Sequence, residues 1–353
     1  MSANSKIEWT DHTFNPWTGC TKVSPGCDHC YAEGWSQRAG AKVGKWGLGA
    51  PRVRTTATNW RQPLKWNAQA GEFMAQHGRR QRVFCASLAD VFDNAVDPAW
   101  RVDLWQLIQD TPNLDWLLLT KRVGNVFGML PDGWAFQSAP WPNVWIGATV
   151  VDQSEADRDI QKLLAVPAAK RFLSMEPMLG PVQLGLQCEN WSDDITMDPE
   201  TGARECCKAC DFTGIGNAID WVIVGGESGP DARPMHPDWA RSLRDECAAA
   251  GVPFLFKQWG EWLPISQQAE EFTQRLYRSN RKARLHEDQG ALDDCYGRTC
   301  TVEQAVIHED GSVHAPLEPM AFLQGTGAML TFKAGKKAAG RLLDGVEWNE
   351  VPT

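Results

Sequence analysis

Three cysteines near the amino end of the sequence lie close enough together to bind one metal centre. Cys20, Cys27 and Cys30 fall within eleven residues, and the turn sequence Ser24-Pro25-Gly26 folds Cys27 back toward Cys20. Thiolates are the normal ligands of iron–sulfur clusters, and three of them on a four-iron cluster leave one iron open for a ligand. Zinc is the alternative metal, with His29 or a distant cysteine as fourth ligand. Thiols without a metal are the third interpretation.

Four further cysteines gather in residues 184–219, a segment with little apolar periodicity. Cys188, Cys206, Cys207 and Cys210 can form a four-sulfur zinc site. We interpret the segment as an inserted loop that is too poor in apolar residues to fold on a core of its own, so a structural metal would stabilise it. An auxiliary iron–sulfur cluster and free thiols are the alternatives.

Short apolar segments alternate with helical patterns between residues 10 and 260. One strand is expected before Cys20, and others are expected at 83–88, 116–120, 144–149, 171–176, 221–226 and 253–257. Helices are expected at 98–110, 152–165 and 237–250, with Asp97 as an N-cap and Gly251 at a helix end. About seven strand–helix steps predict an α/β protein with a parallel sheet, built as a full or partial (β/α) TIM-type barrel over residues 1–262.

Polar side chains follow the ends of these strands, which is where the chemistry of a barrel is found. The set comprises Asp90, Asp93, Lys121, Arg122, Thr149, Glu176, Glu227, Lys257 and Gln258. The plain alternative is that polarity simply returns where a buried strand ends. If the barrel forms, five of them converge on the cavity above Cys30: Asp90, Lys121, Thr149, Glu176 and Lys257.

The overall charge and hydropathy exclude two classes of protein. The formal charge of −9 argues against a general polyanion binder, although Arg275, Arg278, Arg281, Lys282 and Arg284 form a local basic cluster, and Lys333, Lys336, Lys337 and Arg341 form another. No run approaches the roughly 18 apolar residues of a membrane span, and residues 1–6 lead into no signal core. We expect a cytoplasmic protein. Most of the 18 tryptophans are expected in the core or in pocket walls, and residues 263–353 are expected to form an irregular appendage.

The segment from Asn15 to Glu33 resembles a phage-associated subgroup of the radical S-adenosylmethionine (SAM) superfamily. The resemblance extends through residues 174–177, 225–229 and 257–260 to residues 335–345, so it spans nearly the whole chain. It implies a barrel-like fold, a 4Fe-4S cluster on Cys20, Cys27 and Cys30, and SAM bound at the open iron. Gly225-Gly226-Glu227 is similar to the element that holds the SAM amine, but here it follows a late strand.

The strand-end residues of the expected barrel have different roles. Asp90, Thr149, Gly225, Gly226 and Glu227 are expected to bind the cofactor, and the resemblance implies this for Gly225, Gly226 and Glu227. Thr149 and Glu176 are expected to hydrogen-bond the SAM ribose or to carry protons near the substrate. Glu176, Lys121 and Lys257 are expected to be catalytic, with a lysine neutralising the SAM carboxylate or a substrate phosphate or carboxylate. A substrate held in duplex DNA must be flipped out, which needs a basic rim, and the Arg275–Arg284 cluster is the candidate.

The function that the resemblance implies is an isomerisation of a modified nucleobase by radical chemistry. The expected substrate is an amino-acid-modified thymidine in hypermodified phage DNA, the expected electron donor is a protein such as flavodoxin, and the expected location is the host cytoplasm if the chain is phage-encoded. Another radical SAM reaction, on tRNA, a peptide or a small molecule or in lesion repair, is one alternative. A zinc-stapled nucleic-acid-binding protein without catalysis is another, from a different class.

Overall fold

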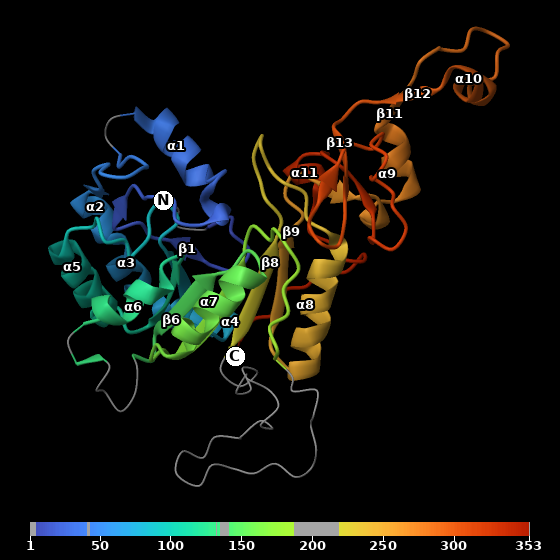
Figure 1. Ribbon diagram of the computed structural model, residues 1–353. Helices are drawn as coiled ribbons and strands as arrows, with labels where there is room; N and C mark the ends of the chain where they lie inside the picture. Colours follow the sequence, from blue (N-terminus) through green and yellow to red (C-terminus); the bar gives the residue numbers. More distant parts are fainter. Residues whose placement is uncertain (1–4, 41–42, 132, 135–140, 187–218, 353) are drawn as a thin grey trace, which may run out of the picture.

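A parallel sheet of seven strands forms the body of the protein in the computed structural model, which describes residues 5–40, 43–131, 133–134, 141–186 and 219–352 (Figure 1). The strand order is β1-β4-β5-β6-β7-β8-β9, and each neighbouring pair is parallel. The strands are β1 (His12–Thr13), β4 (Gln81–Cys85), β5 (Leu114–Thr120), β6 (Val144–Thr149), β7 (Lys170–Met175), β8 (Trp221–Gly225) and β9 (Phe254–Gln258).

The sheet follows the chain order, so it winds in one direction as a barrel does. Within the described residues, β1 and β9 do not pair with each other, and the sheet is a curled half-barrel. The prediction of a partial TIM-type barrel is therefore confirmed in its open form, including the strand before Cys20. Each apolar run that we expected to be a strand is one, because it is buried on both faces.

Helices cover the convex face of the sheet, and their apolar stripes pack on its outward side chains (Figure 1). The three predicted helices are confirmed as α5, α7 and α8, capped by Asp97, by Asp152 and by Gly251 in a left-handed conformation. The helices of this part are α1 (Tyr31–Ala39), α2 (Ala57–Trp60), α3 (Gln62–Ala68), α4 (Ala70–His77), α5 (Pro98–Gln109), α6 (Val123–Met129), α7 (Gln153–Leu164) and α8 (Pro237–Ala250). The strands β2 (Trp17–Thr18) and β3 (Val53–Arg54) form a short antiparallel ribbon, and the cysteine loop follows β2 in the chain.

Aromatic side chains fill the concave face of the sheet and form the floor beneath any site above it. Trp9 contacts Phe84, Phe172 and Trp221 with ring centroids 4.6, 6.3 and 6.3 Å away. Trp145 belongs to the same buried cluster. The expectation that most of the 18 tryptophans lie in the core or in pocket walls is borne out, because eleven are buried in the described part of the chain. Six of them are fully buried: Trp9, Trp17, Trp116, Trp134, Trp221 and Trp259.

The carboxyl-terminal part contains regular structure, which corrects the expectation of an irregular appendage. A four-stranded antiparallel sheet has the order β10-β15-β13-β14, and β11 and β12 form a separate hairpin. Its strands have two to four residues, too short to show an alternating pattern in the sequence. The elements are β10 (Leu263–Pro264), η5 (Ile265–Gln267), α9 (Glu270–Arg275), β11 (Tyr277–Ser279), α10 (Gln289–Tyr296), β12 (Arg298–Cys300), β13 (Gln304–Ile307), β14 (Val313–His314), β15 (Met329–Phe332) and α11 (Lys336–Ala339).

The last residues of the chain return to the half-barrel. Asn349 bridges Leu255 in an antiparallel manner, and the indole N–H of Trp221 donates to the carbonyl of Glu350 at 2.8 Å. The edge strand β9 is thereby covered, which protects its unpaired backbone groups from other chains. The division of the chain at residue 262 stays a prediction. No helix in the described ranges is long and apolar enough to cross a membrane.

Candidate active site

The cysteine loop runs from β2 to α1 and is shaped by its own short-range hydrogen bonds. Ser24 caps the single turn η1 (Pro25–Cys27), its Oγ accepting from the N–H of Gly26 at 3.0 Å. Cys30 is the N-cap residue of α1. Gly26 lies so close to the barrel that a Cβ there would be 2.7 Å from a methyl of Val151. The predicted turn is therefore present, and it presses the loop against the ends of the strands.

A cavity of about 710 Å³ opens at the carboxyl ends of the strands, directly beside this loop. All three cysteines line it, and all three are free thiols. The structure brings the predicted strand-end residues to the same cavity: Asp90, Lys121, Thr149, Glu176, Gly226, Glu227 and Lys257. Gly225 does not line the cavity but lies next to Glu176, because a Cβ on Gly225 would be 2.6 Å from Oε1 of Glu176. Residues from the ends of six strands, β4 to β9, therefore meet around one space.

An ion pair forms one wall of the cavity. Nζ of Lys257 lies 2.9 Å from Oε1 of Glu176, and Ser174 donates to Oε2 at 3.2 Å. The side chains of Lys257 and Glu176 are 19% and 13% exposed, and both line the cavity. The absence of a side chain at Gly225 leaves the space that the Glu176 carboxylate occupies. The pair can exchange hydrogen bonds with a ligand without moving from its place.

Lys121 is a cation without a carboxylate partner in the described part of the chain. Its Nζ donates to Oγ1 of Thr149 at 3.4 Å, which is a weak contact. Thr149 is buried at the end of β6. Because a partly buried ammonium gains most from an anionic partner, this position suits a ligand carboxylate or phosphate.

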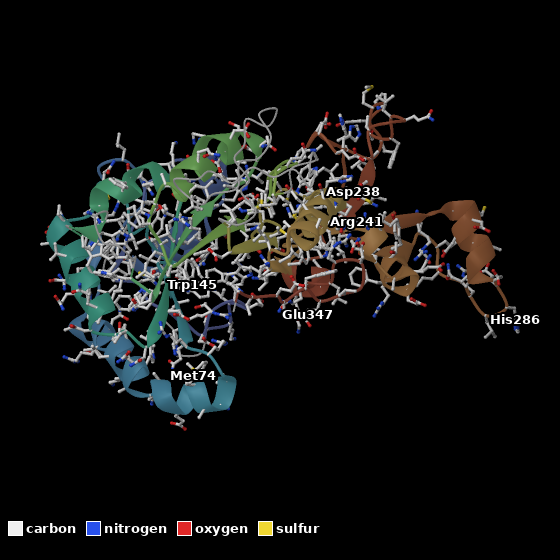
Figure 2. All side chains as sticks on the ribbon, turned by 90° about the horizontal axis from the view of Figure 1, so that it is seen from below. Met74, Trp145, Asp238, Arg241, His286 and Glu347 are labelled. Atoms are coloured by element: carbon white, nitrogen blue, oxygen red, sulfur yellow. The ribbon has the colours of Figure 1, made fainter. Side chains whose placement is uncertain are left out.

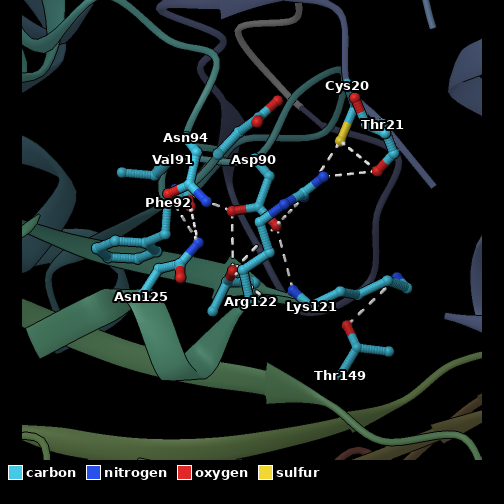
Figure 3. Close-up of polar contacts among 12 residues, drawn as sticks. Cys20, Thr21, Asp90, Val91, Phe92, Asn94, Lys121, Arg122, Asn125 and Thr149 are labelled. Carbon is cyan, nitrogen blue, oxygen red and sulfur yellow. Dashed lines mark hydrogen bonds and ion pairs between the residues drawn. The ribbon is translucent and has the colours of Figure 1, made fainter. Parts of the chain in front are cut away.

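Asp90 and Arg122 form a buried pair that reaches the first cysteine (Figure 3). Nη1 of Arg122 lies 3.0 Å from Oδ2 of Asp90 and 3.4 Å from Sγ of Cys20. Asp90 also accepts from the hydroxyl of Thr120 at 2.8 Å. Burial raises the pKa of the Cys20 thiol to about 11, the charge of Asp90 adds to this, and Arg122 opposes it. Asp90 therefore orients the arginine that contacts Cys20.

Glu227 ties the end of β8 to the cysteine loop. Its carboxylate accepts from Arg233 through Nη2 at 2.7 Å and through Nε at 2.8 Å, and it lies 3.1 Å from Nδ1 of His29. Burial would raise the pKa of Glu227, but the hydrogen bonds from Arg233 and His29 outweigh burial and lower it. Arg233 also reaches Asp28 at 3.2 Å. The glutamate expected to hold the SAM amine is thus already engaged by two side chains.

One contact of the site was not predicted from the sequence, and one predicted surface lies elsewhere. Arg122 was among the expected strand-end residues, and it lines the cavity. Arg233, which contacts Glu227, follows a glycine turn and had no signal. Lys336, from the second basic cluster, lines the cavity. The Arg275–Arg284 cluster does not, which corrects its assignment as the rim: it belongs to a hairpin that projects away from the half-barrel (Figure 1).

The donor set fits an iron–sulfur cluster better than a single ion. Within the described residues, no group of three or more His, Cys, Asp and Glu side chains is arranged around one metal ion. A single zinc needs four ligands at one point, whereas each thiolate of a four-iron cluster binds a different iron and the sulfurs stay apart. Cys20, Cys27 and Cys30 around one cavity meet the second requirement. Cys188, Cys206, Cys207 and Cys210 lie outside the described residues.

The fold and the site define an α/β half-barrel protein with a cysteine-lined cavity at the carboxyl ends of its strands. A family model matches residues 4–352, and the chain belongs to that family, which is described as protein of unknown function DUF5131. No curated protein matches the sequence.

Two solved structures that resemble the chain are both variants of spore photoproduct lyase. One, with bound AdoMet and dinucleoside spore photoproduct, is 10% identical at a TM-score of 0.33, with 77% of this chain and 66% of that chain covered. The other is 12% identical at a TM-score of 0.33, with 83% of this chain and 76% of that chain covered. Scores this low carry no functional assignment.

Proposed function

We propose that the protein is a radical SAM enzyme whose 4Fe-4S cluster is held by Cys20, Cys27 and Cys30. The observation that carries the proposal is that these three free thiols line one cavity together with the polar ends of six parallel strands. When bound, such a cluster supplies an electron for radical chemistry on SAM. Three thiolates leave one iron open, as SAM chelation requires.

The side chains of the cavity have the chemistry to bind and orient SAM. Lys121, without a carboxylate partner in the described ranges, would neutralise the SAM carboxylate or a substrate phosphate. Thr149 presents a hydroxyl beside it for the ribose. Glu227, held by Arg233, fixes the cysteine loop and would share its carboxylate with the SAM amine. The aromatic floor below Trp9 closes the cavity to water from beneath.

The Glu176–Lys257 pair is the candidate for proton handling near the substrate. A carboxylate 2.9 Å from an ammonium can accept or return a proton at Oε2 while Oε1 remains paired. Asp90 acts through Arg122, so we assign it a positioning role and not direct cofactor contact.

The substrate that we propose is a modified nucleobase in DNA, an amino-acid-modified thymidine that the enzyme isomerises. The resemblance of residues 15–33 and 225–229 to the phage-associated subgroup supports this choice. Radical chemistry on tRNA, a peptide or a small molecule uses the same cavity and is separated by the substrate test. The alternative of a non-catalytic zinc protein depends on cysteines outside the described residues. Metal analysis distinguishes it, because that protein would contain zinc and no iron or sulfide.

Metal analysis and spectroscopy test the proposal. Anaerobically purified protein should carry about four irons with matching sulfide, and SAM should change the EPR spectrum of the reduced cluster. Cys20→Ala, Cys27→Ala and Cys30→Ala should each lose most of the iron, whereas Cys295→Ser, at an exposed thiol far from the cavity, should keep it. Full iron content in the triple variant, or an EPR spectrum that SAM leaves unchanged, would reject the proposal. Mass spectrometry of nucleosides from DNA incubated with reduced protein and SAM tests the substrate.

A further inference from the structure

A stretch of twelve residues in the carboxyl-terminal part has five cations and no acid. Residues 275–286 contain Arg275, Arg278, Arg281, Lys282 and Arg284, in a chain whose formal charge is −9. The stretch begins at the end of α9, forms β11 and leads to α10; we call residues 275–300 the basic arm. In Figures 1 and 2 the arm projects from the body, and His286 lies at its far end.

Three of the four acids of the arm hold the arm together, and Asp294 is the fourth. Glu287 pairs with Arg281 at 2.8 Å, and Asp293 lies 3.7 Å from Arg298. Asp288 caps α10 by accepting from the N–H of Ala291. Internal neutralisation of this kind is the ordinary fate of a surface charge cluster.

Four cations of the arm escape this neutralisation. Arg275, Arg278, Lys282 and Arg284 are exposed, and in the described part of the chain none of their side chains has an ion pair. Arg275 donates only to a backbone carbonyl, that of Glu271. An uncompensated positive surface attracts polyanions, and its projection from the body keeps it away from the negative charge of the rest of the protein.

The arm is held in a fixed shape before any partner arrives. The hairpin pairs Tyr277 with Cys300 and Ser279 with Arg298. Arg281 donates to the hydroxyl of Tyr296 at 2.6 Å, and its guanidinium lies 4.8 Å from the centroid of that ring. A preformed arm loses little conformational entropy on binding.

An apolar side chain stands at the tip among the cations. Leu285 is 86% exposed, between Arg284 and His286, and His286 has a left-handed φ of 76° that turns the chain there. A leucine so exposed gains by entering an apolar environment. Minor-groove-binding proteins place such apolar wedges, flanked by basic residues, between base steps.

We propose that the basic arm binds the phosphate backbone of duplex DNA and inserts Leu285 between base pairs from the minor groove. The proposal deepens the proposed function, on which it rests, by naming the surface that would hold a polymeric substrate and open its stack. Arginine, four of the five cations, presents a planar fork that matches phosphate oxygens. An acidic protein would use the charge but not the wedge. An anionic membrane would use both, so the choice of DNA rests on the proposed function, and the test includes anionic vesicles.

Removing two cations from the arm, and two from a control surface, tests whether the arm binds the DNA phosphates. The affinity of the full-length, cluster-containing protein for a fluorescent DNA duplex is measured by anisotropy across salt concentrations, without SAM or reductant. A plot of log affinity against log salt concentration has a negative slope. Lys282→Ala/Arg284→Ala should make this slope shallower by about 2, because two phosphate contacts are lost. Arg61→Ala/Lys65→Ala removes one arginine and one lysine that are also exposed, on α2–α3, and should keep the wild-type slope. A wild-type slope in the arm variant would overturn the proposal.

A base-stacking reporter tests the wedge. Wild-type protein should raise the fluorescence of 2-aminopurine in the duplex, because unstacking relieves quenching. Leu285→Ala should lose that rise and keep the salt slope, while Leu317→Ala, 97% exposed on a different loop, should behave as wild type. Equal unstacking by Leu285→Ala, or binding to anionic vesicles but not to DNA, would overturn the proposal. None of these measurements needs SAM cleavage, so the two proposals can fail separately. If the radical chemistry is intact and the arm does not bind DNA, only the proposal for the arm is wrong. If the arm binds DNA and no radical chemistry occurs, only the proposed function is wrong.

Discussion

Arg122 donates a hydrogen bond to Sγ of Cys20 at 3.4 Å from the same nitrogen that lies 3.0 Å from Asp90. The two residues are 102 positions apart in the sequence, and the guanidinium is 8% exposed. A buried positive charge beside a thiolate stabilises added electron density on the cluster that the thiolate binds. Hydrogen bonds to the sulfurs are one of the factors that set the potential of an iron–sulfur cluster.

Arg122→Gln should make the reduction potential of the cluster more negative, by on the order of 60 mV, which corresponds to about 1.4 kcal/mol for one electron. The measurement is a redox titration followed by EPR. Arg122→Lys keeps the charge beside Asp90 and should shift the potential less. Arg54→Lys, at a surface ion pair with Asp103, is the control and should leave it unchanged. A wild-type potential in Arg122→Gln with full iron content would show that Arg122 is only structural.

Lys121→Gln should weaken SAM binding about tenfold, which is about 1.4 kcal/mol. The reason is that the cavity loses a cation that has no carboxylate partner in the described residues and would pair with the SAM carboxylate. Calorimetric titration of the anaerobic protein with SAM measures it. Lys162→Gln, a surface lysine on α7 paired with Asp159, removes the same charge away from the cavity and should bind SAM normally. Unchanged SAM affinity with weakened DNA processing would move Lys121 from the SAM carboxylate to a substrate phosphate.

Glu176 and Lys257 should show strong energetic coupling in a double-mutant cycle of Glu176→Gln and Lys257→Met. Each single change leaves the other group in a site that is less than a fifth exposed, so the coupling in the free energy of unfolding should be about 1–3 kcal/mol. Urea denaturation measures it. The exposed pair of Lys333 and Glu303 serves as the comparison, with coupling of about 0.2–1 kcal/mol. Additive effects at the cavity pair would mean that solvent screens it.

The half-barrel could be predicted from the sequence because each element carries its own local signal. The run 144–149 is apolar, is flanked by polar residues and coincides with β6. Asp97 and Pro98 begin α5, where the side chain of Asp97 accepts from the N–H of Ala99. Cavity residues such as Thr149 could be predicted because the carboxyl ends of parallel strands lie along one edge of the sheet. Local pattern and global fold agree here, as natural sequences require.

The contacts that tie the site together could not be predicted, because they join distant segments. Arg233 meets Glu227 only after the chain turns, and the approach of His29, 198 positions away, depends on the whole half-barrel. The strands β13 and β15 pair with each other in an antiparallel manner. They are too short for an alternating pattern in the sequence to have predicted them. The basic cluster was visible as charge, but whether it formed a rim or an arm depended on the β11–β12 hairpin.

Glu227→Gln should lower the free energy of unfolding by about 2 kcal/mol at neutral pH, because Arg233 loses its charged acceptor in a site where Glu227 is 6% exposed. The folded-state pKa of Glu227 lies below its ordinary value of 4.5, so the carboxylate stabilises the fold fully above that value. This stabilisation is lost as the pH falls through 4.5 and then through the folded pKa, because the unfolded state takes up the proton first. The difference between wild type and variant, measured by urea denaturation, should therefore shrink in acid. Glu303→Gln, at an exposed pair with Lys333, should change stability by only a few tenths of a kcal/mol at any pH. A difference that stays constant into acid would mean that the glutamine has lost packing and not charge.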